Sequence, residues 1–157
     1  MFKSAYGIAV TLRVLFEDHA IPSDHMVVGG GGALVAMGLR EETQDINLWL
    51  NEESFRKLAA HQNVICHPMV DTAFQYKSGH GAEWDKENPI WIRKRNTYFK
   101  VVVEEDLQIF DVMTLMIQKR GGYTQPERPK AKRDQDLIDI RLLNDLLAEK
   151  NKVKEVA

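Results

Sequence analysis

Apolar residues recur at the spacing of one helical face in three long segments of the chain. The segments are residues 5–19, residues 111–119 and a stretch that starts near Arg133. A further helical pattern follows Asn51, with Phe55, Leu58 and Ala59 on its inward face. Asn51 and Asp111 can each cap the helix that follows, because a short polar side chain accepts hydrogen bonds from the first backbone N–H groups. We therefore expect helices to begin directly after both residues, whereas the tail, residues 150–157, is expected to fray.

Other segments have the apolar pattern of β-strands. Residues 44–50 alternate between polar and apolar positions, so that Ile46, Leu48 and Leu50 share one face of a half-buried strand. Further strands are predicted over residues 25–28, 64–66, 90–93, 98–103 and 107–110. A short helix is predicted over residues 33–37, and loops are predicted over residues 76–89 and 121–132, which are rich in glycine and charged residues.

Composition limits the class of protein. The 157 residues fit a single domain over residues 1–157, and a hydrophobic content of 44% excludes disorder of the whole chain. Cys66 is the only cysteine, so neither an intrachain disulfide nor a cysteine-based zinc site can form, and a cytoplasmic location is expected. The apolar runs fall short of the roughly 20 residues that span a bilayer, so no membrane contact is expected.

Charge is nearly balanced over the chain but is distributed unevenly. The formal net charge is −2, yet residues 119–133 contain six basic residues and one acidic residue, Glu127. This basic loop, residues 119–133, could attract a nucleic acid such as tRNA or DNA. Its basic residues from Arg128 to Arg133 have no aromatic residues between them, and an ordinary solvated loop has the same composition, so both interpretations stay open.

Four consecutive glycines, Gly29–Gly32, follow the predicted strand over residues 25–28 and precede the predicted short helix. Backbone N–H groups at such a turn can bind phosphate oxygens, because no side chain blocks their approach. A tight turn with close packing of helix against strand requires glycine equally well. The glycines alone therefore leave both interpretations open.

Asp45 and Asn47 strengthen the phosphate interpretation. Asp45 comes thirteen positions after Gly32, and the two polar side chains point to the same side of an alternating strand. Two oxygen ligands beside a phosphate cradle are what a magnesium–triphosphate complex requires, because Mg²⁺ prefers hard oxygen ligands that it shares with the nucleotide. Catalysis in such a site consists largely of positioning and charge neutralisation at phosphorus.

Three stretches together resemble a known signature. They are the glycine run with Ala33-Leu34, then Gly38-Leu39-Arg40, then Thr43-Gln44-Asp45-Ile46-Asn47-Leu48. The series is similar to the signature of the DNA polymerase β-like nucleotidyltransferase superfamily, above all to the minimal forms among the toxins of abortive-infection and toxin–antitoxin systems. Residues 111–119 resemble the helix that leads to the family's lysine, and residues 133–140 resemble the family's closing helix. The resemblance implies an α+β fold, a nucleotidyltransferase-like mixed β-sheet flanked by helices.

The same resemblance implies roles for single residues. Contacts to the NTP fall on Gly30, Gly31, Gly32, Thr43 and Asp136. The catalytic positions are Asp45, Asn47 and Lys119, and Asp45 and Asn47 would also bind Mg²⁺. The family has an aspartate at the position of Asn47. Because a neutral amide oxygen replaces a charged carboxylate there, we expect a lower affinity for the metal.

Most of these residues have a structural interpretation as well. Lys119 is a favourable cation at a helix C-terminus, and Asp136 can form an ion pair with Arg133. The family's third carboxylate has three candidates, which could also be ordinary solvated acids: Asp71, Glu104 and Asp106. Trp49 lies on the Asp45 side of its strand and could stack on a base, although packing within the fold is the alternative.

Two hypotheses about function follow. In the first, the chain is an enzyme that transfers a nucleoside monophosphate from an NTP to an acceptor with Mg²⁺. In the second, the loss of a carboxylate at Asn47 has left a weakened, non-catalytic protein of the same fold that binds a nucleotide, a nucleic acid or a protein partner. The family resemblance alone adds the possibility of a toxin–antitoxin or phage-defence component.

Overall fold

The structure is a computed structural model and describes residues 1–67, 71–96 and 99–156. The chain divides into two compact units, Met1–Phe110 and Asp111–Ala157, which are described separately. Among the described residues, each helix is too short or too polar to cross a lipid bilayer. The assignment of residues 1–157 to one domain stays a prediction.

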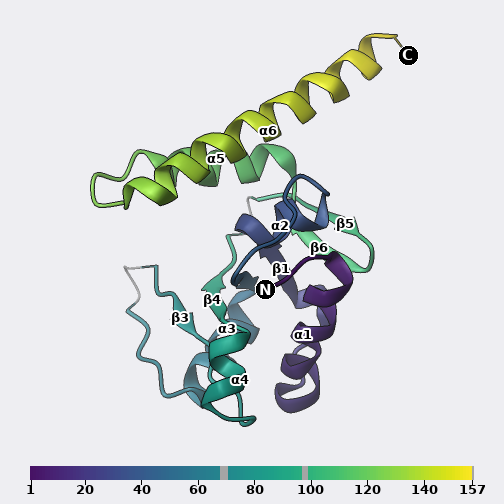
Figure 1. The fold of residues 1–157 in the computed structure, drawn as a ribbon. Coiled ribbons are helices and arrows are strands. Elements are labelled where there is room, and N and C mark those ends of the chain that lie inside the picture. The colour runs from purple at the N-terminus through teal and green to yellow at the C-terminus, as the bar shows by residue number, and fades with distance from the viewer. Residues whose placement is uncertain (68–70, 97–98, 157) are drawn as a thin grey trace. The chain divides into compact units, whose positions relative to one another are not determined.

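The first unit contains a six-stranded mixed sheet, and the α+β class is confirmed (Figure 1). Its strands are β1 (Met26–Gly29), β2 (Ile46–Leu50), β3 (Phe74–Gln75), β4 (Ile90–Lys94), β5 (Val101–Glu104) and β6 (Leu107–Phe110). They lie in the order β3-β4-β2-β1-β6-β5. The central pair, β1 and β2, is antiparallel, whereas β4 runs parallel to β2 and β6 runs parallel to β1.

The helices of the first unit are α1 (Ala5–His19), α2 (Gly30–Ala36), α3 (Glu52–His61) and α4 (Ala82–Glu87), with a short 3₁₀ turn over Ser23–His25. Helix α2 packs on β1 and β2, and α3 packs on β2 and β4. Ile46, Leu48 and Leu50 are fully buried on the sheet face that forms the core, as their alternation predicts.

Local signals in the first unit gave correct element boundaries. The helix predicted over residues 5–19 is α1, where the hydroxyl of Ser4 accepts a hydrogen bond from the Gly7 N–H. Asn51 caps α3 as predicted, and its side chain accepts from the Ser54 N–H. Both caps satisfy backbone donors that have no partner inside the helix.

Other predictions for the first unit were wrong. Residues 64–66 form no strand, and the loop predicted over residues 76–89 contains α4. The short helix begins at Gly30 rather than at Ala33, so three of the four glycines belong to the helix itself. The strand predicted over residues 98–103 is β5, which begins at Val101; Tyr98 lies outside the described residues.

The second unit is a pair of helices, α5 (Val112–Tyr123) and α6 (Lys130–Val156). Asp111 caps α5 as predicted and accepts from the Thr114 N–H. Half of the predicted loop over residues 121–132 is helical, and only residues 124–129 connect the two helices. Arg133 supports this short connection by donating to the Gln125 carbonyl at 2.5 Å. Fraying of residues 150–157 stays a prediction, although the backbone is helical to Val156.

We predict that the turn between β5 and β6 limits the stability of the first unit. Glu105 and Asp106 both have positive φ, 46° and 65°, a conformation that glycine and asparagine adopt at lower cost. Glu105→Asn combined with Asp106→Gly should raise the free energy of unfolding by about 1 kcal/mol in urea titrations. Glu105→Ala, which keeps the strained β-carbon, is the control. An equal gain in the control would show that the strain is not the cause.

We also predict a loss of stability in mild acid that depends on His19. Its Nε2 lies 2.8 Å from the Tyr76 hydroxyl, and its ring packs edge-on against His61 at 4.7 Å between centroids. Burial, with a smaller effect of His61, lowers the pKa of His19 below its ordinary value of 6.5. The unfolded chain therefore binds this proton first, and the free energy of unfolding falls as the pH drops below 6.5.

Chemical unfolding between about pH 7 and about pH 5 measures this effect. His19→Gln should flatten the pH dependence, because glutamine can still bond to the Tyr76 hydroxyl and does not titrate. The exposed His67 is the control, and His67→Gln should leave the pH dependence in place. A His19→Gln profile with the wild-type slope would contradict the assignment.

Candidate functional site

The glycine turn and the Asp45–Asn47 segment are adjacent in the first unit. Strands β1 and β2 pair in a register that sets Gly29 opposite Asn47. The next residue, Gly30, has a φ of 56°, and a methyl group added there would lie 3.1 Å from Asn47 Nδ2. The predicted adjacency of the glycines and the polar strand face is therefore present at Gly30 and Asn47.

Packing accounts for the other three glycines. A methyl group at Gly29 would lie 2.6 Å from the Trp49 ring, and one at Gly32 would lie 2.9 Å from the Val28 side chain. At Gly31 it would lie 2.6 Å from both the Arg40 guanidinium and the Thr43 hydroxyl. Gly31 and Gly32 are buried and Gly30 is half-buried. Gly30 is therefore the most accessible of the three glycines that we predicted to hold phosphate.

Thr43 holds the segment before Asp45 in place. Its backbone exchanges two hydrogen bonds with Phe2, at 2.8 and 2.9 Å, and its hydroxyl donates to the Asp45 carbonyl at 3.3 Å. Only 4% of Thr43 is exposed. These contacts give Thr43 a positioning role, while its predicted contact with a nucleotide stays a prediction.

Asp45 and Asn47 lie at the half-exposed face of the sheet. Asp45 sits in the bend directly before β2, and Asn47 is the second residue of that strand. Both residues are half-buried, in contrast to Ile46 and Leu48 on the core face. Both residues are thus partly exposed to solvent, and Asn47 lies against Gly30.

Two tryptophans share this face. Trp49 packs edge-on against Phe110 at 5.1 Å, and the Arg93 guanidinium lies 5.5 Å from its ring centroid. Trp91 of β4 pairs with Asn47 across the parallel β2–β4 ladder. Sequence reasoning considered Trp49, Trp84 and Trp91 as base-stacking candidates and preferred Trp49. The alternation in residues 90–93 indicates on which side of its strand Trp91 lies. It does not indicate that this strand pairs with β2.

The candidates for a third carboxylate lie elsewhere in the first unit. Because β6 runs parallel to β1, the start of β6 and the preceding Asp106 lie beside the start of β1, at the opposite end from the glycines. Glu104 pairs with Leu107 at that same end. Among the described residues, no group of three or more His, Cys, Asp or Glu side chains is arranged to hold a metal ion.

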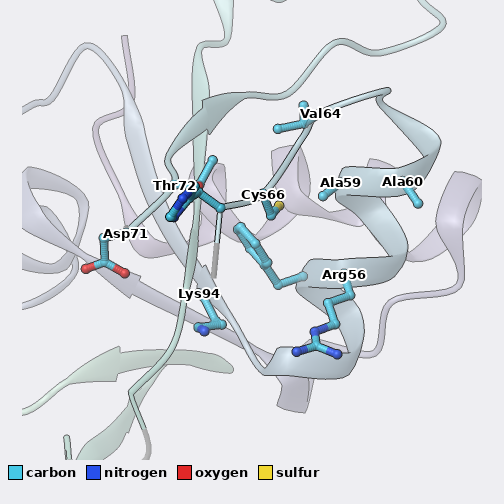
Figure 2. A pocket seen from close by; sticks show the side chains of 10 residues that line it. Arg56, Ala59, Ala60, Val64, Cys66, Asp71, Thr72 and Lys94 are labelled. Atoms are coloured by element: carbon cyan, nitrogen blue, oxygen red, sulfur yellow. The ribbon is translucent and has the colours of Figure 1, made fainter. Parts of the chain in front are cut away.

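Asp71 lines a separate hollow of about 330 Å³ between α3 and residues 64–67 and 71–72 (Figure 2). Figure 2 shows the Cys66 thiol within this hollow and the side chains of Arg56 and Lys94 at one end of it. A second hollow of about 360 Å³ lies beside α1 and includes Met26 and Asp106. Neither hollow is lined by Asp45, Asn47 or the glycines.

The second unit contains a cluster of four charged side chains, of which the two aspartates are buried. Lys119 Nζ lies 2.9 Å from Asp139 Oδ2 and 3.7 Å from Asp136 Oδ1. Arg128 binds both carboxylate oxygens of Asp136 through Nε and Nη2, and Gln135 donates to Asp139 Oδ1 at 2.8 Å. Asp136 and Asp139 are 1% and 0% exposed. Lys119 and Asp136, which sequence reasoning assigned to the nucleotide, thus bind each other inside this unit.

The ion pairs of this cluster neutralise part of the positive charge of the basic loop, residues 119–133. Lys119 and Arg128 form ion pairs with buried aspartates, whereas Arg120, Lys130 and Lys132 are exposed. Arg128 packs over Gly122, where an added methyl group would lie 3.5 Å from its guanidinium carbon. The positive charge available at this surface is therefore smaller than the sequence suggested, and binding of tRNA or DNA stays a prediction.

Comparison of the chain with models of protein families, with curated proteins and with solved structures gives no match.

We predict that Lys119 stabilises the second unit. Lys119→Met removes the cation that lies 2.9 Å from the buried Asp139, and removal of one partner from a buried ion pair costs about 3 kcal/mol of folding free energy. Urea unfolding followed by circular dichroism measures the loss. Lys132→Met, which removes the same charge from an exposed position of α6, should change the free energy of unfolding by less than about 0.5 kcal/mol. Equal effects of the two changes would exclude this role.

Proposed function

We propose that the chain is a nucleotidyltransferase-like protein of the cytoplasm that binds an NTP together with Mg²⁺ beside Gly30, Asp45 and Asn47. The observation that carries the proposal is the contact between Gly30 and Asn47, which sets the glycine turn and the polar strand side by side. The motif resemblance requires that adjacency. The half-exposed positions of Asp45 and Asn47 support it as well.

The chemistry of the donor set agrees with a weakly held divalent cation. The Asp45 carboxylate and the Asn47 amide oxygen are hard ligands of the kind that Mg²⁺ shares with nucleotide phosphates. Bound Mg²⁺ would neutralise charge on the triphosphate during transfer. In the transfer, an acceptor oxygen forms a bond to the α-phosphorus while the bond to the departing pyrophosphate breaks. Gly30 would leave room for a phosphate oxygen, since it carries no side chain.

A second candidate function is nucleotide binding without transfer. The neutral Asn47 occupies the place at which the family resemblance expects a carboxylate, and the described residues contain no three-acid group to compensate for it. Such a protein would still bind a nucleotide beside Gly30. A nucleic acid, a protein partner or a toxin–antitoxin or phage-defence role belongs to this candidate, on the strength of the resemblance alone.

We predict that Asp45 and Asn47 have opposite effects on activity when they are changed. The assay measures the covalent labelling of RNA, DNA or protein by an NTP radiolabelled at the α-phosphate, with Mg²⁺, alongside calorimetric titration of the NTP. Asp45→Ala should weaken NTP binding about tenfold or more, because a charged contact is lost. Asn47→Asp should strengthen binding in the presence of Mg²⁺ and raise any labelling.

Asp24→Ala, an exposed carboxylate in the same unit, is the matched control and should bind the NTP as the wild type does. Labelling by the wild type supports the enzyme. Labelling only after Asn47→Asp supports the non-catalytic candidate. If neither the wild type nor Asn47→Asp binds any of the four NTPs with Mg²⁺, the proposed function is wrong.

A further inference from the structure

The outer edge of β5 is an exposed, regular strand edge. β5 is the last strand of the sheet, at the end opposite β3 (Figure 1). Val102 and Val103 are 42% and 70% exposed. Soluble proteins usually protect such edges with proline, an inward charge or a very short strand. The β3 edge has only two residues, whereas β5 has four and contains three consecutive valines.

The register of the β5–β6 hairpin shows which backbone groups face outward. Its turn has two residues, and Glu104 pairs with Leu107 across it. In a two-residue hairpin the pair that flanks the turn exchanges hydrogen bonds, and hydrogen-bonded pairs then alternate along the ladder. The backbone groups of Glu104 and Val102 therefore point to β6. Those of Val101 and Val103 point away from the sheet, toward a further strand.

The sequence of this edge is complementary to itself when it is reversed. Residues 100–104 read Lys-Val-Val-Val-Glu. If a second copy pairs antiparallel with Val102 on the two-fold axis, Val101 of each copy faces Val103 of the other, and their outward backbone groups can form hydrogen bonds. In the same register Lys100 lies opposite Glu104 on each side of the axis. Opposite charges at facing positions of adjacent strands stabilise that pairing.

We propose that β5 is a homodimerisation edge, at which a second copy of this chain adds its own β5 in antiparallel orientation. The arrangement joins the two sheets through a two-fold axis at Val102 and removes two exposed strand edges. The interface is short, so the dimer forms in a concentration-dependent equilibrium. This inference does not depend on the nucleotide site, which lies at Gly30 and Asn47.

Reversing the charges of Lys100 and Glu104 tests the proposed register of the two β5 strands. Sedimentation velocity over a concentration series should show the wild type in a monomer–dimer equilibrium. Each single variant, Lys100→Glu or Glu104→Lys, places two pairs of like charges in the interface, one on each side of the axis. Each should therefore raise the dissociation constant about tenfold or more. An equimolar mixture of the two variants restores both opposite-charge pairs and should form heterodimers. The double variant Lys100→Glu with Glu104→Lys should dimerise as the wild type does.

The controls make the same charge changes on α6. Glu149→Lys and Lys152→Glu alter exposed residues far along the sequence from β5 and should leave the equilibrium unchanged. A wild type that stays monomeric to its solubility limit overturns the proposal. Single variants that dimerise as well as the wild type overturn this register.

A cross-linking experiment gives a second, independent readout. In an antiparallel pair without mutual hydrogen bonds, the two Cα atoms lie about 4.5 Å apart, within the range that a disulfide can bridge. In a Cys66→Ser background, Val102→Cys should form a disulfide dimer on oxidation. Val103→Cys, whose facing residue is Val101, should cross-link much more slowly. Equal rates for the two variants would contradict a two-fold axis at Val102.

Discussion

The antiparallel register between β1 and β2 is the constraint on which the candidate site depends. It sets Gly29 opposite Asn47 and directs the chain from β1 into α2 through Gly30, whose φ is 56°. Glycine adopts this angle without the steric cost that a β-carbon brings. A shift of one residue would exchange the two faces of β2, burying Asn47 and exposing Leu48. The burial of Ile46, Leu48 and Leu50 therefore fixes which residues can face a ligand.

Sequence reasoning succeeded where the determining contacts are local. The alternation over residues 44–50 and the caps at Asn51 and Asp111 each depend on neighbours within about one turn or one strand. Sequence reasoning failed where the position of a residue depends on pairing between segments that are distant in the sequence. The parallel pairing of β4 with β2 sets Trp91 beside Asn47, and the parallel pairing of β6 with β1 takes Asp106 to the other end of the sheet. No local pattern specifies which strands become neighbours.

Lys119 shows that one sequence pattern can be explained either by a ligand or by packing within the fold. Its predicted task was to neutralise phosphate charge, and its observed contacts are the buried carboxylates of Asp136 and Asp139. With Arg128 the cluster holds two positive and two negative groups, so their formal charges cancel. A phosphate that recruited Lys119 would remove the cation that lies 2.9 Å from the buried Asp139, and the loss of one partner from a buried ion pair costs several kcal/mol. The cluster thus accounts for the conjunction of Lys119, Asp136 and Asp139 without a ligand.

In the glycine run, too, packing contacts explain most of the positions without a ligand. Trp49 over Gly29, Arg40 and Thr43 over Gly31, and Val28 beside Gly32 each exclude a larger residue. These contacts are needed for the fold whether or not a nucleotide binds. Gly30 differs, because its close neighbour is a polar side chain on the half-exposed face. Asparagine and aspartate have nearly the same shape, so a carboxylate at position 47 would change the charge beside Gly30 with little repacking. The two proposed functions therefore differ in the charge of one side chain rather than in the fold.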